Sequence, residues 1–545
     1  MLDWTKLTIG KALQEAAGLW GDKEAVKTNT ETLTYSELYE KACQLASGLS
    51  SLGIKKGDSV ATVFGTVPQW IIAKYAIHLV GARLVPINIS FKSLEIEYIL
   101  KQSDVKTIIV TDKLRQGDFL AILSEIDPNK IVSDDRKIKS DKFPFLELII
   151  TFSPEKNKYP FSYDFYEAIE LGVGYKKSDI NKNLAEIKPD DICSIMFTSG
   201  STAFPKGAMH KHTSLLGIGK NFYGSTFNLN PSHNLLCFFP FYHIAGCVYY
   251  TLGALMNGCS LYVNEFIPDE VLPIIQNEKI NLFGGFDAHF NAISNHPTLN
   301  EFDLNSIKFV ILATGPEWYD RCMNIFPSAE LIAHHYGFTE GTGVSMNPDE
   351  KDYNVRKFSN GSPWPGIEVK VVNPETGEKV PANEPGELCL RGWSRFQGYY
   401  KNSEETKKAI DSEGYFHTGD YGWLDEKGNV YYRGRYKMMI KSGGENVSER
   451  EVEMFLEGLT GVKSVQIIGV PDKTWGEAVT AIIEPDEKIT MKKDDVINYC
   501  KGKIATFKIP KYVLFIKGSE WPLIGPGKVD KKQLKQWALK NLNLE

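Results

Sequence analysis

A hydroxyl-rich loop at residues 198–207 is the feature that most constrains the fold of this chain. A short apolar run with strand character, residues 192–197, precedes it, and a helix is expected from about Thr213. The loop, TSGSTAFPKG, contains four hydroxyl side chains, two glycines and the lysine Lys206. Backbone N–H groups in such a loop can converge on a phosphate, and the lysine adds a positive charge. The loop is not a Walker loop, in which the glycine and lysine residues stand in a different order. The alternative interpretation is a flexible surface loop without a bound phosphate.

Length and composition exclude several classes of protein. A chain of 545 residues is expected to form two or more domains. The formal net charge of −6 argues against a nucleic-acid binder. No signal peptide is recognisable and no apolar run approaches about 18 residues, which predicts a cytoplasmic protein without a transmembrane segment. Peripheral membrane contact and the oligomeric state stay open. The eight scattered cysteines predict reduced, buried thiols rather than a zinc site.

The pattern of apolar residues predicts an α/β fold. Helical and strand-like segments alternate before the loop, as in layered α/β proteins. Residues 35–52 have apolar side chains at helical spacing, and Gly53 follows where a helix should end. Short apolar runs bounded by turn residues, such as 235–239 and 309–312, are typical of interior parallel strands.

Two changes in sequence character divide the chain into predicted domains. Residues 1–433 form the first domain, and its last part, from about 358 to 433, is rich in Gly, Pro and aromatic residues and predicts a β subdomain of hairpins. Residues 434–444, GRYKMMIKSGG, have glycines at both ends and predict a hinge. Residues 445–545 have the size of one small α+β domain.

Two later stretches place carboxylates where a nucleotide could use them. In HHYGFTEGTG, residues 334–343, Glu340 could bind Mg²⁺, because hard cations prefer carboxylate oxygens. In YFHTGDYG, residues 415–422, Asp420 lies between glycines at a strand end, and a carboxylate there can accept both hydroxyls of a ribose. An ordinary capped turn and an Asx turn are the alternatives.

Basic residues near the end of the chain form a third candidate group. The predicted hinge contains Arg435, Lys437 and Lys441, although such a run is usually a solvated charge cluster. Lys528 follows two glycines in the stretch WPLIGPGKVDKK, which should be a loop. A lysine on a mobile loop could reach a reacting phosphate, but most loop lysines only contact solvent.

The histidines are less informative. His243 lies among aromatic residues in FFPFYHIAG, where it either lines a pocket or is a core histidine. His210 and His212 have the spacing of metal ligands, but without a partner cluster they are interpreted as structural. A hydrolase is disfavoured, since the chain contains no G-x-S-x-G nucleophile elbow.

Taken in this order, the motifs resemble those of the acyl-adenylate-forming superfamily, which includes acyl-CoA synthetases, luciferases and peptide-synthetase adenylation domains. The pattern T-S-G-S-T-x-x-P-K-G, followed by Y-G-x-T-E, T-G-D and a late P-x-x-x-x-G-K, is specific as a set, and it extends over essentially the whole chain. The resemblance is strongest to the acyl-CoA synthetases. It implies a large N-terminal domain of two doubly wound α/β halves plus a β subdomain, and a small mobile C-terminal lid domain.

The resemblance also implies roles in nucleotide binding. The residues expected around the β- and γ-phosphates are Thr198, Ser199, Gly200, Ser201, Thr202 and Lys206. Those expected to enclose the adenine are Gly315, Pro316, His335 and Tyr336. Asp420 and Arg435 are expected to hold the ribose, and Lys437 is expected to be the hinge residue.

For catalysis, the resemblance implies that Thr339 contacts the α-phosphate and that Glu340 binds Mg²⁺. Lys528 is expected to stabilise the charge that develops as the carboxylate attacks the α-phosphorus. The lid would then rotate, so that the turn from Lys441 through Gly443 and Gly444 to Glu445 serves a second half-reaction with a thiol.

Coenzyme A is the expected thiol, because SGGENV, residues 442–447, resembles the lid turn of acid–CoA ligases. The predicted function is therefore an ATP-dependent carboxylic acid–CoA ligase that requires ATP, Mg²⁺ and coenzyme A. The apolar, uncharged residues expected near His243 favour a medium- or long-chain fatty acid, and an aryl acid is the alternative. A luciferase-like enzyme, an enzyme that loads a carrier protein and a catalytically silent scaffold remain as further alternatives.

Three residues depart from the superfamily pattern. Ala203 replaces a usual glycine in the phosphate loop, Met438 stands where an acidic residue is frequent, and Glu449 stands where many relatives have proline. Alanine tolerates positive φ poorly, so the loop is expected to differ slightly. None of these changes removes a group with an assigned chemical role.

Overall fold

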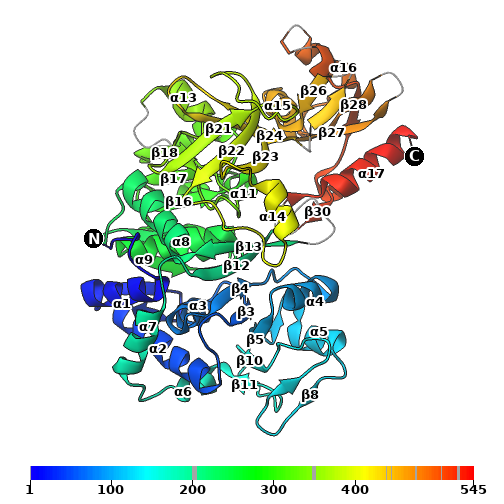
Figure 1. Ribbon diagram of the computed structural model, residues 1–545. Helices are drawn as coiled ribbons and strands as arrows, with labels where there is room; N and C mark the ends of the chain where they lie inside the picture. The colour runs from blue at the N-terminus through cyan, green and yellow to red at the C-terminus, as the bar shows by residue number, and fades with distance from the viewer. Residues whose placement is uncertain are drawn as a thin grey trace.

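The computed structural model describes residues 2–198, 205–346, 351–436, 439–442, 445–472, 475–501, 503–504, 506–524 and 528–544. Figure 1 shows the residues before 436 as the larger part of the molecule, with the orange-to-red residues after 445 packed against one end. None of the helices in the described part of the chain is both long and apolar enough to cross a membrane.

The first of the two large sheets contains seven strands. Their spatial order is β11 (Tyr163–Asp164), β10 (Leu148–Phe152), β5 (Val105–Thr111), β3 (Ser59–Val63), β4 (Arg83–Pro86), β12 (Ile192–Thr198) and β13 (Lys206–Lys211). All neighbours pair in parallel except β12 and β13. Strands β3 and β10 are completely buried, which explains why most of their residues are apolar.

The second large sheet also contains seven strands. Their order is β18 (Leu331–His334), β17 (Phe309–Leu312), β16 (Leu282–Gly285), β14 (Asn234–Cys237), β15 (Ser260–Val263), β1 (Glu24–Lys27) and β2 (Thr32–Thr34). The strands from β18 to β1 pair in parallel, which confirms the prediction for the short apolar runs. One hydrophobic core joins both large sheets and the helices between them.

The helices around these sheets are amphipathic or fully buried. Their bounds are α1 (Ile9–Trp20), α2 (Tyr35–Ser51), α3 (Pro68–Val80), α4 (Ser93–Gln102), α5 (Phe119–Ile126), α6 (Phe165–Glu170), α7 (Lys177–Glu186), α8 (His212–Ile218), α9 (Thr251–Asn257), α10 (Pro268–Asn277), α11 (Asp287–Ser294), α12 (Glu317–Ile325) and α13 (Tyr353–Phe358). Helix α2 begins with a capping box formed by Thr34 and Glu37. Helix α3, buried on all sides, ends at Gly81 in the left-handed conformation, as helices commonly do.

A four-stranded antiparallel sheet follows, as predicted for the β subdomain. It consists of β21 (Ile367–Val372), β22 (Gly386–Gly392), β23 (Phe416–Leu424) and β24 (Val430–Arg435), and α14 (Ser403–Ala409) lies between β22 and β23 in the sequence. The predicted hairpin across residues 427–429 is present between β23 and β24. Strand β24 continues into the segment predicted as the hinge.

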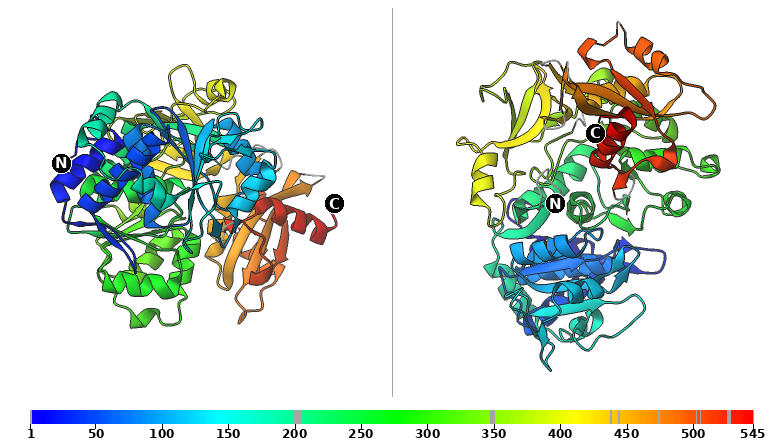
Figure 2. Two further views of the ribbon diagram at one scale, coloured as in Figure 1. Left: turned by 90° about the horizontal axis from the view of Figure 1, so that it is seen from below. Right: turned by 90° about the vertical axis from the view of Figure 1, so that its right-hand side faces the viewer.

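The C-terminal part has its own small cores. Its sheet is formed by β26 (Glu445–Ser448), β25 (Met439–Ser442), β28 (Gly476–Pro485), β27 (Val462–Asp472) and β29 (Tyr512–Phe515), with α15 (Glu449–Glu457), α16 (Lys493–Cys500) and α17 (Lys531–Leu542) around it. Figure 2 shows this part beside the antiparallel sheet in a second direction of view. The domain boundaries drawn from the sequence remain predictions.

Two local expectations need correction. A strand, β13, stands between the phosphate loop and helix α8, so Lys206 begins a strand that pairs antiparallel with β12. Lys528 begins the short strand β31 (Lys528–Val529), which pairs with β30 (Leu523–Ile524), whereas a loop was expected. The residues within each of these strands do not indicate which neighbouring strand it pairs with. All eight cysteines are free and buried, as expected.

Candidate active site

A cavity of about 570 Å³ lies at the carboxyl ends of β16, β17 and β18. Its walls come from the second large sheet, from strands β23 and β24, and from α15 and α17 of the C-terminal part. Ligands of α/β proteins bind at this end of a parallel sheet. The cavity brings together seven of the residues predicted from the sequence: His243, Gly315, Pro316, His335, Tyr336, Asp420 and Arg435.

Asp420 is the best-defined polar group of this cavity. It pairs with Arg435 across β23 and β24, and its Oδ1 lies 3.0 Å from the Arg435 Nε. The Tyr336 hydroxyl donates a hydrogen bond of 2.8 Å to the Asp420 Oδ2. Burial raises the pKa of Asp420 to about 6, and Arg435 and Tyr336 oppose this rise. The site therefore holds a carboxylate whose charge is only partly compensated.

The strand that carries Asp420 is fixed by a second ion pair. His417 Nδ1 lies 2.8 Å from the Glu387 Oε2, and the backbone N–H of Gly419 donates to the Glu387 Oε1 at 2.9 Å. The hydrogen bond to Glu387 raises the pKa of His417. Glu387 thus anchors both residues that lead into Asp420, although the sequence analysis gave it no role.

His335 provides a neutral ring at the cavity wall. Its Nε2 lies 3.2 Å from the Tyr249 hydroxyl, and burial lowers the pKa of His335 to about 3. Gly315 follows β17 across the cavity, where a Cβ would collide with the side chains of Glu317 and Arg450. A flat uncharged ring and a bare backbone suit the two faces of an adenine.

One part of the cavity wall is mainly apolar. His243 is exposed, and its ring packs edge-on against Phe286 with centroids 6.3 Å apart. The neighbouring apolar and aromatic lining residues include Phe222, Tyr223, Phe239, Ile244, Ala245, Tyr249, Tyr250 and Ile311. This wall can accept an uncharged hydrocarbon or an aromatic group, and His243 therefore lines a pocket rather than the core.

Lys206, Glu340 and Thr339 do not line this cavity. Lys206 and Glu340 instead both contact Tyr399. The Tyr399 hydroxyl donates a hydrogen bond of 3.0 Å to the Glu340 Oε1, and the Tyr399 ring centroid is 5.2 Å from the Lys206 Nζ. Thr339 is half-buried next to Glu340. The Thr198 hydroxyl lies 3.5 Å from the Lys206 carbonyl oxygen. The predicted phosphate and Mg²⁺ residues thus form a second group.

Several predicted residues lie outside the described part of the chain. These are Ser199, Gly200, Ser201, Thr202, Lys437, Gly443 and Gly444, and the departures Ala203 and Met438. For Lys441, Glu445 and Lys528 the structure describes the backbone, in strands β25, β26 and β31. Their roles remain predictions.

The C-terminal part contributes residues to the cavity that were not predicted from the sequence. Glu449, Arg450, Glu453 and Met454 of α15 and Lys531 of α17 line it. The Lys531 Nζ lies 2.7 Å from Glu449 and 2.6 Å from Glu453, so these charges are paired. No local motif marks these residues, although Glu449 was noted as a departure from the superfamily pattern.

Arg450 connects the two parts of the protein at the cavity. Its guanidinium contacts the carboxylate of Glu317, the first residue of α12, and lies 3.0 Å from Glu457. Because these side chains are only about one-quarter exposed, the contact is less screened than a surface ion pair.

We expect Arg450→Met and Glu317→Gln each to speed proteolytic cleavage at residues 434–444 about fivefold, as loss of a coupled charge pair predicts. The measurement is limited proteolysis of the intact protein. The exchanged pair Arg450→Glu with Glu317→Arg should restore part of the protection. Equal cleavage rates in wild type and all variants would contradict this role.

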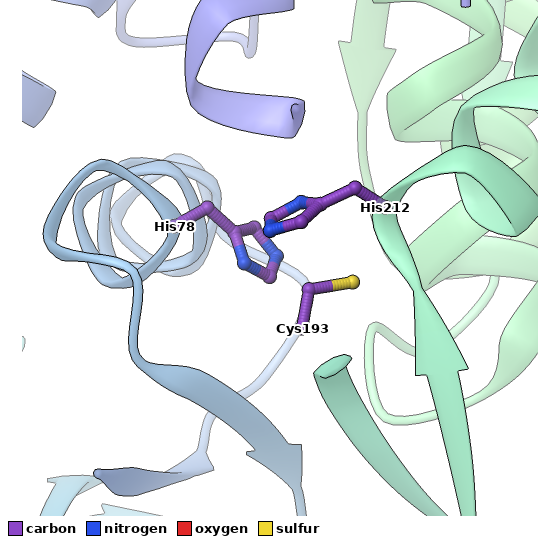
Figure 3. Close-up of side chains that lie close together, drawn as sticks. All are labelled: His78, Cys193 and His212. Carbon is purple, nitrogen blue, oxygen red and sulfur yellow. The ribbon is translucent and has the colours of Figure 1, made fainter. Parts of the chain in front are cut away.

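A second cluster, His78, Cys193 and His212, has the composition of a metal site, and Figure 3 shows these buried side chains close together. One observation argues against a metal. The backbone N–H of Ile9 donates to the His212 Nδ1 at 3.1 Å, which leaves the ring proton on the Nε2. Burial lowers the pKa of His78, so its ring is neutral. We therefore interpret these residues as neutral core residues, in agreement with the expectation for His212.

Comparison with known proteins identifies the family. Residues 13–400 match the profile of the AMP-binding enzymes, and residues 451–528 match that of the AMP-binding enzyme C-terminal domain. YngI of Bacillus subtilis, assigned by name to the acyl-CoA synthetases, is 32% identical over 98% of both chains. The mitochondrial medium-chain acyl-CoA ligase ACSF2 of Bos taurus is 30% identical over 98% of this chain and 88% of its own. A bicyclic octahydroindenyl-propanoyl:CoA ligase of Rhodococcus jostii is 30% identical over 97% of this chain and 98% of its own.

Solved structures share the fold. ATP-bound MatB from Rhodopseudomonas palustris superposes with a TM-score of 0.83 at 24% identity over 99% of this chain and 100% of its own. The anthranilate CoA ligase AuaEII in complex with anthranoyl-AMP superposes with a TM-score of 0.84 at 23% identity over 99% of both chains. The prediction of an α/β fold with a large N-terminal and a small C-terminal domain is confirmed. With its family profiles and relatives spanning nearly its full length, this chain belongs to the AMP-binding enzymes, and the predicted membership of the acyl-adenylate-forming superfamily is confirmed.

Proposed function

We propose that this AMP-forming acid–CoA ligase activates a medium- or long-chain fatty acid. The observation that supports this most strongly is the cavity itself, in which the paired Asp420 and Arg435 share the lining with a group of apolar, largely aromatic side chains. A nucleotide and an apolar acid can meet in such a site. The ligase names of the relatives agree with this class of reaction.

In the first half-reaction, a carboxylate oxygen of the acid attacks the α-phosphorus of ATP, and the bond to the bridging oxygen breaks so that pyrophosphate leaves. Asp420 accepts hydrogen bonds from the ribose hydroxyls. The adenine is enclosed by His335, Tyr336, Gly315 and Pro316. These contacts fix an in-line approach and keep water from the reacting carboxylate. Thr339 contacts the α-phosphate, and Lys528 stabilises the charge that develops there.

Glu340 fits the role of a Mg²⁺ ligand. Its Oε1 accepts a hydrogen bond from Tyr399, and among the described residues no Lys or Arg forms an ion pair with it. A carboxylate without such a partner is suited to binding a hard cation. When bound, Mg²⁺ neutralises phosphate charge. Lys206 and the loop before it supply the remaining positive charge and N–H donors.

In the second half-reaction, the thiolate sulfur of coenzyme A attacks the acyl carbonyl carbon, and the carbon–oxygen bond to AMP breaks. The turn from Lys441 to Glu445 guides the pantetheine after the lid has rotated about Lys437. The acyl-adenylate stays in the cavity during this exchange, because Asp420 and Arg435 pair across β23 and β24, which precede the expected hinge residue Lys437.

An aryl acid is the second candidate substrate. Phe222 and Tyr249 stack with their rings 4.8 Å apart, and Phe239 packs edge-on against Phe286 at 5.6 Å. Aromatic side chains of this kind can pack against a flat substrate as well as enclose an alkyl chain.

The test is release of AMP from ATP and Mg²⁺ with a panel of carboxylic acids, with and without coenzyme A. We expect turnover that requires both a fatty acid and coenzyme A. Turnover with aryl acids alone would show that the substrate is an aryl acid and not a fatty acid. Turnover that ignores coenzyme A would point to another acceptor, as in a luciferase-like or carrier-loading enzyme. Binding of ATP without turnover of any acid would indicate a silent scaffold.

A further inference from the structure

The segment from Phe396 to Ala409 is docked on strand β13 next to the predicted phosphate site. The N–H of Tyr400 donates to the Gly207 carbonyl oxygen at 2.8 Å, and the N–H of Met209 donates to the Gly398 carbonyl oxygen at 3.0 Å. The N–H of Phe396 also donates to the backbone oxygen of Glu340 at 2.7 Å. This segment therefore contacts the backbone of both the strand that begins at Lys206 and the turn that carries Glu340.

Glu405 forms a direct ion pair with the phosphate-site lysine. Its Oε2 lies 2.5 Å from the Lys206 Nζ, and its Oε1 lies 2.9 Å from the Lys408 Nζ. Lys206 lowers the pKa of the Glu405 carboxyl to about 2, with Lys408 as the second cause. The backbone N–H of Glu405 is capped by the Asn402 side chain at 3.1 Å, so the helix turn that presents Glu405 is itself fixed.

Tyr399 holds the same lysine from a second direction. Its ring lies under the Lys206 Nζ, and its hydroxyl reaches Glu340. Tyr399 is 7% exposed, and its backbone N–H donates to the Thr406 hydroxyl at 2.9 Å. The ring therefore has little freedom to move. Lys206 and Glu340 come from distant parts of the sequence, and Tyr399 contacts both.

We propose that Glu405 is a positioning residue for ATP: with the Tyr399 ring it holds the Lys206 ammonium in place for the polyphosphate, while the Tyr399 hydroxyl orients Glu340 for Mg²⁺. The ammonium has three N–H donors, and the Glu405 Oε2 accepts one of them. The others remain for phosphate oxygens. A long flexible lysine that is already fixed loses less conformational entropy on binding. This inference rests on the proposed function.

The test measures binding of Mg·ATP to the intact protein by calorimetry, without acid or coenzyme A. We expect Glu405→Gln to weaken binding about tenfold, as loss of a charge-assisted hydrogen bond predicts. In turnover assays the KM for ATP should rise more than kcat falls. Glu405→Asp, which keeps the charge, should recover part of the affinity. Glu405 is 30% exposed, so the thermal midpoint of the variant should stay near that of wild type.

Two further variants separate the parts of the proposal. Lys408→Met removes the other cation on Glu405, and since Lys408 is 70% exposed, binding should change less than twofold. Tyr399→Phe keeps the ring but loses the hydroxyl, and should raise the Mg²⁺ concentration needed for half-maximal ATP binding.

Three outcomes would overturn the proposal. Tighter ATP binding by Glu405→Gln would show that Glu405 competes with phosphate, and unchanged binding would show that it does not position Lys206. An unchanged Mg²⁺ requirement in Tyr399→Phe would refute the link to Glu340. Failure of the wild type to bind ATP would instead overturn the proposed function, and the inference with it.

Discussion

A Lys528→Ala variant is expected to form the acyl-adenylate about a thousandfold more slowly than wild type, yet to convert a supplied acyl-adenylate and coenzyme A to the thioester at nearly the normal rate. Removal of a single group that stabilises developing charge has an effect of this size. The second half-reaction needs no charge at that position, because the lid has rotated.

The structure supports this expectation through the position of the hairpin. Lys528 pairs with Ile524 in strands β31 and β30, and Lys531, three residues later, lines the cavity. Pyrophosphate release with acid and ATP measures the first half-reaction, and thioester formation from synthetic acyl-adenylate measures the second. Lys532→Ala, at an exposed position of α17, is the matched control. An equal loss in both half-reactions would show that Lys528 has a different role.

Replacing Asp420 with asparagine is expected to lower kcat/KM for ATP about a hundredfold, because the ribose hydroxyls lose charge-assisted hydrogen bonds. The same replacement should stabilise the fold. The pKa of Asp420 in the folded protein, about 6, is above its ordinary value of 3.8. The folded state therefore binds this proton more tightly than the unfolded chain does. Proton binding contributes fully to the stability of the fold below the ordinary pKa, and this contribution is lost as the pH rises through about 6.

At pH 7.5 the ionised carboxylate therefore destabilises the native state, and Asp420→Asn should raise the free energy of unfolding by about 2 kcal/mol. Urea unfolding at pH 7.5 and at pH 4.5 measures this, and the difference from wild type should shrink at the lower pH. The wild-type kcat/KM for ATP should fall as the pH drops below about 6, whereas that of the variant should not. A less stable variant, or one with normal use of ATP, would contradict this role of Asp420.

Much of the fold was predictable from local sequence. Helix α2 (Tyr35–Ser51) lies where residues 35–52 have helical spacing, and the short apolar runs became the parallel strands of the second large sheet. Burial on both faces gives such strands an unbroken apolar sequence. Strands β13 and β31 were missed, because each depends on pairing with a neighbour: β13 with β12, and β31 with β30.

The sequence by itself determined the family, the order of the motifs and the candidate groups for the nucleotide, because a phosphate loop or an isolated carboxylate between glycines is encoded within a few residues. Only the tertiary structure decided which of these groups share a cavity and what supports them. Glu405 pairs with Lys206 from 199 residues away, and Arg450 reaches Glu317 from 133 residues away. Contacts over such separations follow from the packing of whole elements, and the residues on either side carry no local pattern that identifies the partner.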